Sequence, residues 1–92
     1  MPKFLIEVPH EAKFQACAEA VKSFLETGSH FLTHAEWGCD DNEHKAWLIV
    51  ELEDKQTARN IIPPNFRHNA PITQLRQYSM KDVDQMLESH SE

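Results

Sequence analysis

The stretch HKAWLIVEL, residues 44–52, decides the fold because its apolar and polar side chains alternate along the chain. A period of two residues is typical of a β-strand that lays one face against a core. The residues on the apolar face are His44, Ala46, Leu48, Val50 and Leu52. We therefore predict a strand here, whose apolar face other elements must cover.

Three further segments complete a predicted sheet. Residues 3–8, KFLIEV, alternate with Phe4, Ile6 and Val8 on one side. Residues 30–39 carry Phe31, Thr33, Ala35, Trp37 and Cys39 at the same period. Residues 72–78, ITQLRQY, supply a last strand, and the proline before it is tolerable at the start of an edge strand.

Helical signals separate these strands. Apolar residues after the first strand recur at helical spacing, and Gly28 stands where a C-cap glycine belongs. Asp54 can cap a short second helix. Ser79 and Asp82 form a capping box for a C-terminal helix. We expect residues 83–92 of that helix to be partly frayed, as chain ends often are.

The order βαββαβ, followed by a C-terminal helix, predicts an α+β fold of the ferredoxin-like, split βαβ type. Right-handed crossovers then give an antiparallel sheet with the strand order 4-1-3-2. We predict a single domain over residues 1–92. A chain of 92 residues buries only about 60–65% of the surface that its unfolded form exposes. Pairing with a second copy is one way for so small a domain to gain stability.

Composition narrows the class of protein. A net charge of −6 without a basic cluster argues against DNA or RNA as a partner. No apolar run approaches the ~18 residues that a membrane span needs. The N-terminus MPKFLIEVPHE lacks the apolar region of a signal peptide. With two cysteines and no export signal, we expect a cytoplasmic protein with free thiols.

The predicted hairpin between the second and third strands brings a thiol beside an imidazole. If Asp41 and Asn42 form a two-residue turn, Cys39 lies opposite His44. Directly opposed residues have Cβ atoms about 4.5–5.5 Å apart, which is close enough to share one metal ion. The same register places the apolar residues of both strands on one face, which supports it independently.

The topology adds two histidines to this pair. His10 follows the first strand and His68 precedes the last, so both lie along the same edge of the sheet as Cys39 and His44. Thiolate and imidazole ligands suit zinc, nickel or copper(I) and exclude magnesium and calcium. These four residues form the predicted metal site. The alternative is that they are unconnected side chains at the sheet margin and in exposed loops.

Two other features of the sequence are interpreted structurally. On a helix, His30 and His34 would lie about 6 Å apart and could share a cation. On the predicted strand they lie about 13 Å apart, so we predict no chelation within one subunit. Cys17 lies on the apolar face of the first helix and is expected to be a core residue.

The face of the sheet away from the helices is also patterned. It gathers the apolar residues Leu5, Leu32, Trp47 and Ile49. Exposed apolar patches mark interfaces, so we predict a homodimer that packs sheet on sheet around a barrel-like centre. His34, Glu36 and Glu7 would lie inside it as candidate catalytic residues, since an imidazole beside carboxylates suits acid–base chemistry. The alternative role for these three is an interfacial salt-bridge network.

The segments MPKFLIEVP, HAEWGCDDNEHKAWLIVEL and PPNFRHNAPI, in this order, resemble small proteins of the dimeric α+β barrel superfamily. Among them the chain is most similar to single-domain members that bind nickel, and more distantly to muconolactone isomerases and antibiotic-biosynthesis-type monooxygenases. The resemblance implies a homodimer with one metal or small-molecule site per subunit.

Two hypotheses of function follow. The first is a cytoplasmic homodimer that binds nickel or zinc at the edge of the sheet. The second is an isomerase- or monooxygenase-like enzyme that uses His34 as the acid–base group inside the barrel. The enzyme hypothesis predicts a small-molecule pocket lined by Trp47 and Leu32.

Overall fold

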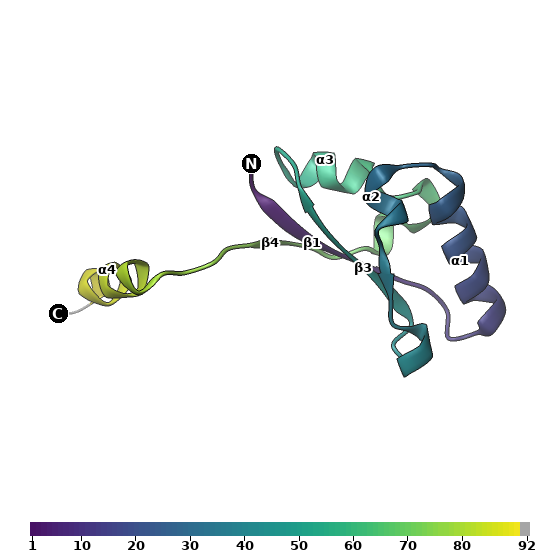
Figure 1. The fold of residues 1–92 in the computed structure, drawn as a ribbon, viewed down its shortest axis with the longest axis horizontal. Helices are drawn as coiled ribbons and strands as arrows, with labels where there is room; N and C mark the ends of the chain where they lie inside the picture. The colour runs from purple at the N-terminus through teal and green to yellow at the C-terminus, as the bar shows by residue number, and fades with distance from the viewer. Residues whose placement is uncertain (91–92) are drawn as a thin grey trace.

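A four-stranded antiparallel sheet is the centre of the fold, in a computed structural model that describes residues 1–90 (Figure 1). Its strands are β1 (Lys3–Pro9), β2 (Glu36–Trp37), β3 (Lys45–Glu51) and β4 (Ile72–Leu75). Their spatial order is β2-β3-β1-β4, which is the predicted order counted from the opposite edge. The prediction of an α+β fold with this antiparallel sheet is therefore confirmed.

The core lies on one face of the sheet, where β1 and β3 place every second side chain. Phe4, Ile6 and Val8 of β1 are no more than 1% exposed. The helices α1 (Phe14–Glu26) and α3 (Lys55–Asn60) contribute Phe24 and Ala58 to the same core. Burying one such large apolar side chain contributes about 1.5–3 kcal/mol, so the alternation fixes which face is covered.

The predicted caps are present at three helices. Gly28 follows the end of α1 with a φ of 68°, a left-handed conformation that suits glycine. The Asp54 carboxylate accepts a hydrogen bond of 2.8 Å from the Thr57 N–H at the start of α3. At α4 (Met80–His90), Ser79 and Asp82 exchange the two hydrogen bonds of a capping box, at 2.9 and 3.1 Å.

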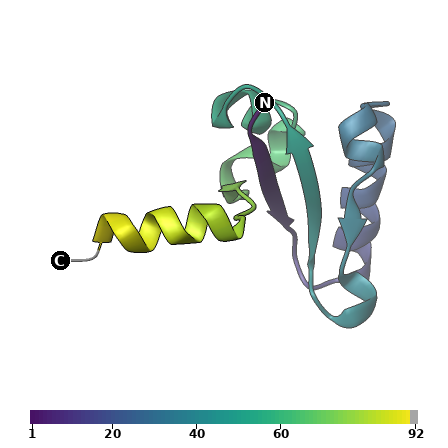
Figure 2. The ribbon, with the colours of Figure 1, turned by 60° about the vertical axis from the view of Figure 1, so that its left-hand side comes forward.

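The α4 helix stands away from the rest of the molecule (Figures 1 and 2). The longest dimension of the molecule is therefore 55 Å, and its radius of gyration is 16.6 Å. A compact domain of this length would have a radius of gyration of about 12 Å. The fraying predicted for residues 83–92 stays a prediction, and residues 91 and 92 lie outside the described chain. None of the helices within residues 1–90 combines the length and apolar character that a bilayer crossing requires.

The strand predicted over residues 30–39 is wrong for most of its length. The segment begins as a helical turn, α2 (His30–Thr33), and only β2 is extended. Ser29 caps the turn by accepting a hydrogen bond of 3.5 Å from the Leu32 N–H. Leu32 is 2% exposed and packs in the core, so it does not lie on the outer face of the sheet. The Ser29 cap and the burial of Leu32 therefore favour a helical turn at residues 30–33, although the apolar residues there also alternate as in a strand.

The β2–β3 hairpin keeps the predicted register but has a different turn. The strands pair in the register that was predicted to set Cys39 opposite His44. The turn is longer than two residues, because η1 (Cys39–Asp41) forms one turn of 3-10 helix. Asn42 ends it with a φ of 61°, in the left-handed region.

Close packing inside the hairpin depends on a glycine. A Cβ atom at Gly38 would lie 2.5 Å from an atom of the Trp47 ring and 2.8 Å from the Glu43 carbonyl oxygen. No side chain fits at that distance, so only glycine lets the Trp47 ring close over the turn.

Candidate metal centre

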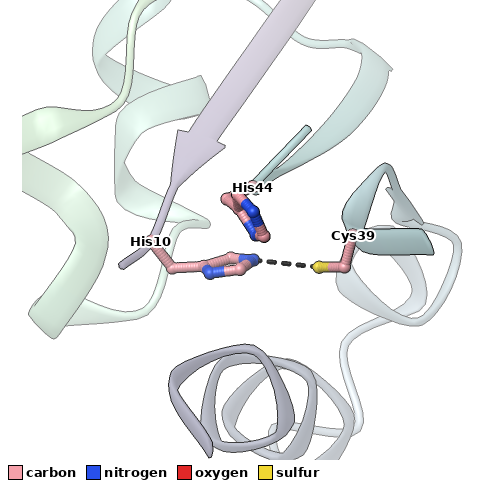
Figure 3. A group of neighbouring side chains, drawn as sticks. All are labelled: His10, Cys39 and His44. Carbon is pink, nitrogen blue, oxygen red and sulfur yellow. Dashed lines mark hydrogen bonds between the residues drawn. The ribbon is translucent and has the colours of Figure 1, made fainter. Parts of the chain in front are cut away.

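Three of the four predicted ligands meet at one edge of the sheet (Figure 3). His10 follows β1, Cys39 opens η1, and His44 immediately precedes β3. One possible ligand atom from each residue lies within 4.8 Å of the other two, and all three residues are half-buried. In the sequence, Cys39 and His44 lie 29 and 34 positions after His10. The fold brings all three into the volume of one coordination sphere.

The backbone holds these three positions in place. The His10 N–H donates a hydrogen bond of 3.1 Å to the His44 carbonyl, which continues the β1–β3 pairing beyond both strands. The Asn42 N–H donates one of 3.1 Å to the Cys39 carbonyl and closes the turn. Sheet register therefore positions the two histidines, and the 3-10 turn positions the cysteine.

The hydrogen bonds of His10 determine which of its ring nitrogens is free. Its Nδ1 lies 2.9 Å from the Glu11 carbonyl oxygen, which can only accept, so Nδ1 carries the hydrogen. In the neutral ring, Nε2 then keeps its lone pair. This atom lies 3.1 Å from the Cys39 sulfur, and in the metal-free state the thiol donates to it (Figure 3).

His44 has the opposite tautomer. Its Nε2 lies 3.0 Å from Oδ1 of Asn42, again an atom that can only accept, so Nε2 carries the hydrogen. The lone pair is therefore on Nδ1. That atom is buried and has no hydrogen-bond partner. Leaving a buried polar atom unsatisfied costs about 1–3 kcal/mol, and a bound metal ion would remove this penalty.

Both histidines thus have the arrangement of metal-bound imidazoles. In metal sites, the ring nitrogen that does not bind the ion donates to a carbonyl or carboxylate, which fixes the tautomer and the ring orientation. Here Glu11 and Asn42 supply these acceptors. The His10 and His44 ring centroids are 5.8 Å apart and the planes make an angle of 74°, so the rings do not stack. The donor set fits a transition-metal ion.

The Cys39 thiol has a pKa raised to about 11, chiefly because burial disfavours the thiolate. The neighbouring Cys17 thiol and the charge of Asp40 raise this pKa further. The thiol is consequently protonated at neutral pH without a metal, and an incoming ion must displace its proton.

Cys17 is the residue near the site that the sequence did not reveal. It lies on α1, is half-buried, and is close enough to raise the pKa of the Cys39 thiol. Its place on the apolar helix face suggested a core residue. A topological signal was nevertheless present, because β1 ends at the same edge of the sheet where α1 begins, which brings the first turns of α1 near His10.

His68 is not part of the group. It lies in η2 (Pro64–Asn69) and is exposed to solvent. Among the side chains that the structure describes, residues 1–89, the group of mutually close ligand atoms contains only His10, Cys39 and His44. A ligand role for His68 stays a prediction without support from this geometry.

His30 and His34 do lie side by side, contrary to the separation of about 13 Å expected on a strand. Their ring centroids are 4.5 Å apart because α2 is helical. However, Nδ1 of His34 is 2.7 Å from the His30 carbonyl oxygen, so it is occupied in capping the helix turn. Both residues are exposed, and no third ligand group joins them within the described chain.

The three candidate catalytic residues differ in their exposure and in their contacts. His34 and Glu36 are exposed, whereas Glu7 is half-buried and pairs with the Lys45 ammonium at 3.6 Å. Leu32, expected to line a pocket with Trp47, lies in the core on the other side of the sheet. Catalytic roles for His34, Glu36 and Glu7 stay predictions.

Comparisons with protein-family models, curated proteins and solved structures find no match to this chain. The resemblance to the dimeric α+β barrel superfamily therefore stays a prediction, and the inference of function rests on the geometry of the site.

Proposed function

We propose that this protein binds one transition-metal ion, nickel or zinc, through Nε2 of His10, the sulfur of Cys39 and Nδ1 of His44. The observation that carries the proposal is the Nδ1 atom of His44, which is buried and has no hydrogen-bond partner, in a residue whose ligand atom lies within 4.8 Å of those of His10 and Cys39. Its orientation is held by Asn42, as expected for a histidine prepared to bind a metal.

The donor set restricts the class of ion. One thiolate and two neutral imidazoles favour borderline and soft ions such as zinc, nickel and copper, and disfavour magnesium and calcium. Three protein ligands also leave one position of a tetrahedral zinc ion for water or another small ligand. The site therefore suits reversible binding of an ion or metal-assisted chemistry at an open position.

Metal content tests the proposal directly. Untagged protein purified without chelators should carry, or take up, about one nickel or zinc ion per chain, measured by elemental mass spectrometry. Cys39→Ser and His44→Ala should lose this ion, and circular dichroism should show that both variants remain folded. His30→Ala is the matched control, because His30 is an exposed histidine outside the group. Stoichiometric binding in both ligand variants would refute the proposed site.

We also propose that two copies pair through the outer face of the sheet. On this face Leu5 lies directly opposite Ile49, and Ile49 is 65% exposed. Helix α4 offers a second uncovered apolar surface, made of Met80, Met86 and Leu87. An isologous dimer lets each surface be covered by the other copy.

Charge does not decide which surface covers the partner's sheet. The outer face carries Lys3 and Lys45 beside Leu5, but also Glu7, Glu36 and Glu51, and Glu7 pairs with Lys45 at 3.6 Å. Sedimentation of the full chain should give the mass of a dimer, and Ile49→Lys should give a folded monomer. A monomeric wild-type chain would contradict this second proposal.

A further inference from the structure

Cys39 has a second neighbour that is not one of the three clustered ligands. Cys17 is close enough to raise the pKa of the Cys39 thiol, and both cysteines are free and half-buried. Both also line one cavity of about 270 Å³, together with His44. Cys17 is not among the residues whose ligand atoms all lie within 4.8 Å of one another. It therefore lies beside the site without belonging to the set of three ligands.

This arrangement gives the Cys39 sulfur two alternative partners. The sulfur can coordinate a metal ion with His10 and His44, or it can bond to the sulfur of Cys17. We propose that Cys17 and Cys39 form a reversible disulfide that competes with the metal, so that oxidation releases the ion and reduction restores the site. The part of this inference that concerns release of the ion rests on the proposed function, which is metal binding at this site.

The chemistry needs a two-electron oxidant, for which we name a hydroperoxide. The Cys39 sulfur attacks the outer oxygen of the hydroperoxide, the O–O bond breaks, and a sulfenic acid forms while an alcohol or water leaves. The Cys17 sulfur then attacks the Cys39 sulfur, an S–S bond forms, and the sulfenic oxygen leaves as water. In sum, two thiols and one hydroperoxide give one disulfide, one alcohol or water, and one further water.

Neighbouring groups can assist both parts of this exchange. Nε2 of His10 lies 3.1 Å from the Cys39 sulfur and can accept the thiol proton, which then passes to the departing oxygen. The metal keeps its charge and loses its only sulfur ligand, which leaves it two imidazoles. Cys17 and Cys39 line the same cavity, which leaves room for their side chains to approach one another.

The test uses the full chain, reduced and freed of metal. Treatment with one equivalent of hydrogen peroxide should lower its mass by two hydrogen atoms, and peptide mapping should find an intrachain Cys17–Cys39 bond. The oxidised protein should no longer take up zinc, and dithiothreitol should restore stoichiometric uptake. Cys17→Ser is the matched control: it should form no intrachain bond, yet bind zinc as the reduced wild type does.

Several outcomes would overturn the inference. Oxidation to sulfinic acid or cross-linking between chains, with no intrachain bond, would show that the two thiols do not react together. Zinc binding that is equal before and after disulfide formation would remove the competition. Loss of zinc in Cys17→Ser would make Cys17 a ligand and not a competitor. Reduced wild-type protein that binds no zinc would refute the proposed function as well, whereas a missing disulfide in a zinc-binding protein refutes only this inference.

Discussion

Two pairs of histidines lie close together in this protein, and they differ in what their ring nitrogens contact. The His30 and His34 rings are the closer pair, at 4.5 Å between centroids, against 5.8 Å for His10 and His44. In the exposed pair, His34 uses Nδ1 to cap its own helix turn. In the half-buried pair, each ring donates a hydrogen bond through one nitrogen and keeps a lone pair on the other, and for His44 that second nitrogen is buried without a hydrogen-bond partner. Proximity is thus a poorer guide to a metal site than the direction of the free lone pairs.

The strongest test of this comparison makes the same alanine substitution in each of the two histidine pairs. His10→Ala removes a ligand and should lower zinc affinity by more than the roughly 10–100-fold that loss of a supporting residue costs. His34→Ala should leave the affinity unchanged, because His34 is not one of the three clustered ligands and its Nδ1 is bonded to the His30 carbonyl. Calorimetric titration of both variants measures the difference, and equal losses would break the comparison.

Metal addition should stabilise the protein through one histidine pair only. Zinc at one hundred times its dissociation constant should raise the free energy of unfolding by about 2.7 kcal/mol, because the ion binds the folded chain. The same concentration should produce no increase in Cys39→Ser, whereas His30→Ala should respond as the wild type does. Urea denaturation with and without zinc gives these values. A response in Cys39→Ser equal to that of the wild type would mean that the ion binds elsewhere.

The role of Asn42 sharpens the comparison, because it orients His44. Asn42→Gly removes the acceptor for Nε2 of His44 and keeps the left-handed turn, since glycine tolerates a φ of 61°. Zinc affinity should fall by about 10–100-fold. Asn42→Asp is the matched control: its carboxylate can still accept the hydrogen bond, so affinity should be retained. If Asn42→Gly bound zinc as tightly as the wild type, the ring would not need this support.

The smallest effect is expected far from both histidine pairs, at the cap of α3. Hydrogen bonds from the Thr57 N–H and hydroxyl hold the pKa of Asp54 below its ordinary value of 3.8. A lowered folded-state pKa means that the cap stabilises fully above the unfolded pKa and is lost as pH falls through the folded one. Asp54→Ala should therefore lower the melting temperature at pH 7, and the gap should close in strong acid. Melting curves of both proteins, recorded with a chelator present, measure this difference in melting temperature. A difference that persists in acid would show that the ionised Asp54 carboxylate is not its cause.

The sequence predicted secondary structure well where the apolar residues of a segment follow a single periodicity. The alternation in KFLIEV and HKAWLIVEL predicts β1 and β3, and the topology then brings His10, Cys39 and His44 to one edge. Residues 30–34 carry apolar side chains that suit both a strand and a helix turn. There the cap at Ser29 and the burial of Leu32 decide for the helix.

Other parts of the site depend on geometry that no pattern in the chain encodes. The cavity that Cys17 shares with Cys39 depends on how α1 crosses the sheet. The free Nδ1 of His44 depends on a single hydrogen bond within a turn whose form was predicted wrongly. Ligand identities could thus be read from residue types and topology, whereas their tautomers and neighbours required the structure.

X-ray absorption of the zinc-loaded protein would test the central claim most directly, because it counts the ligand atoms around the ion. We predict one sulfur at about 2.3 Å and two imidazole nitrogens at about 2.0–2.1 Å, with any remaining ligand a light atom. A shell that contains only oxygen and nitrogen would exclude Cys39. Two sulfurs in the shell would bring Cys17 into the ligand set and contradict the three-residue site.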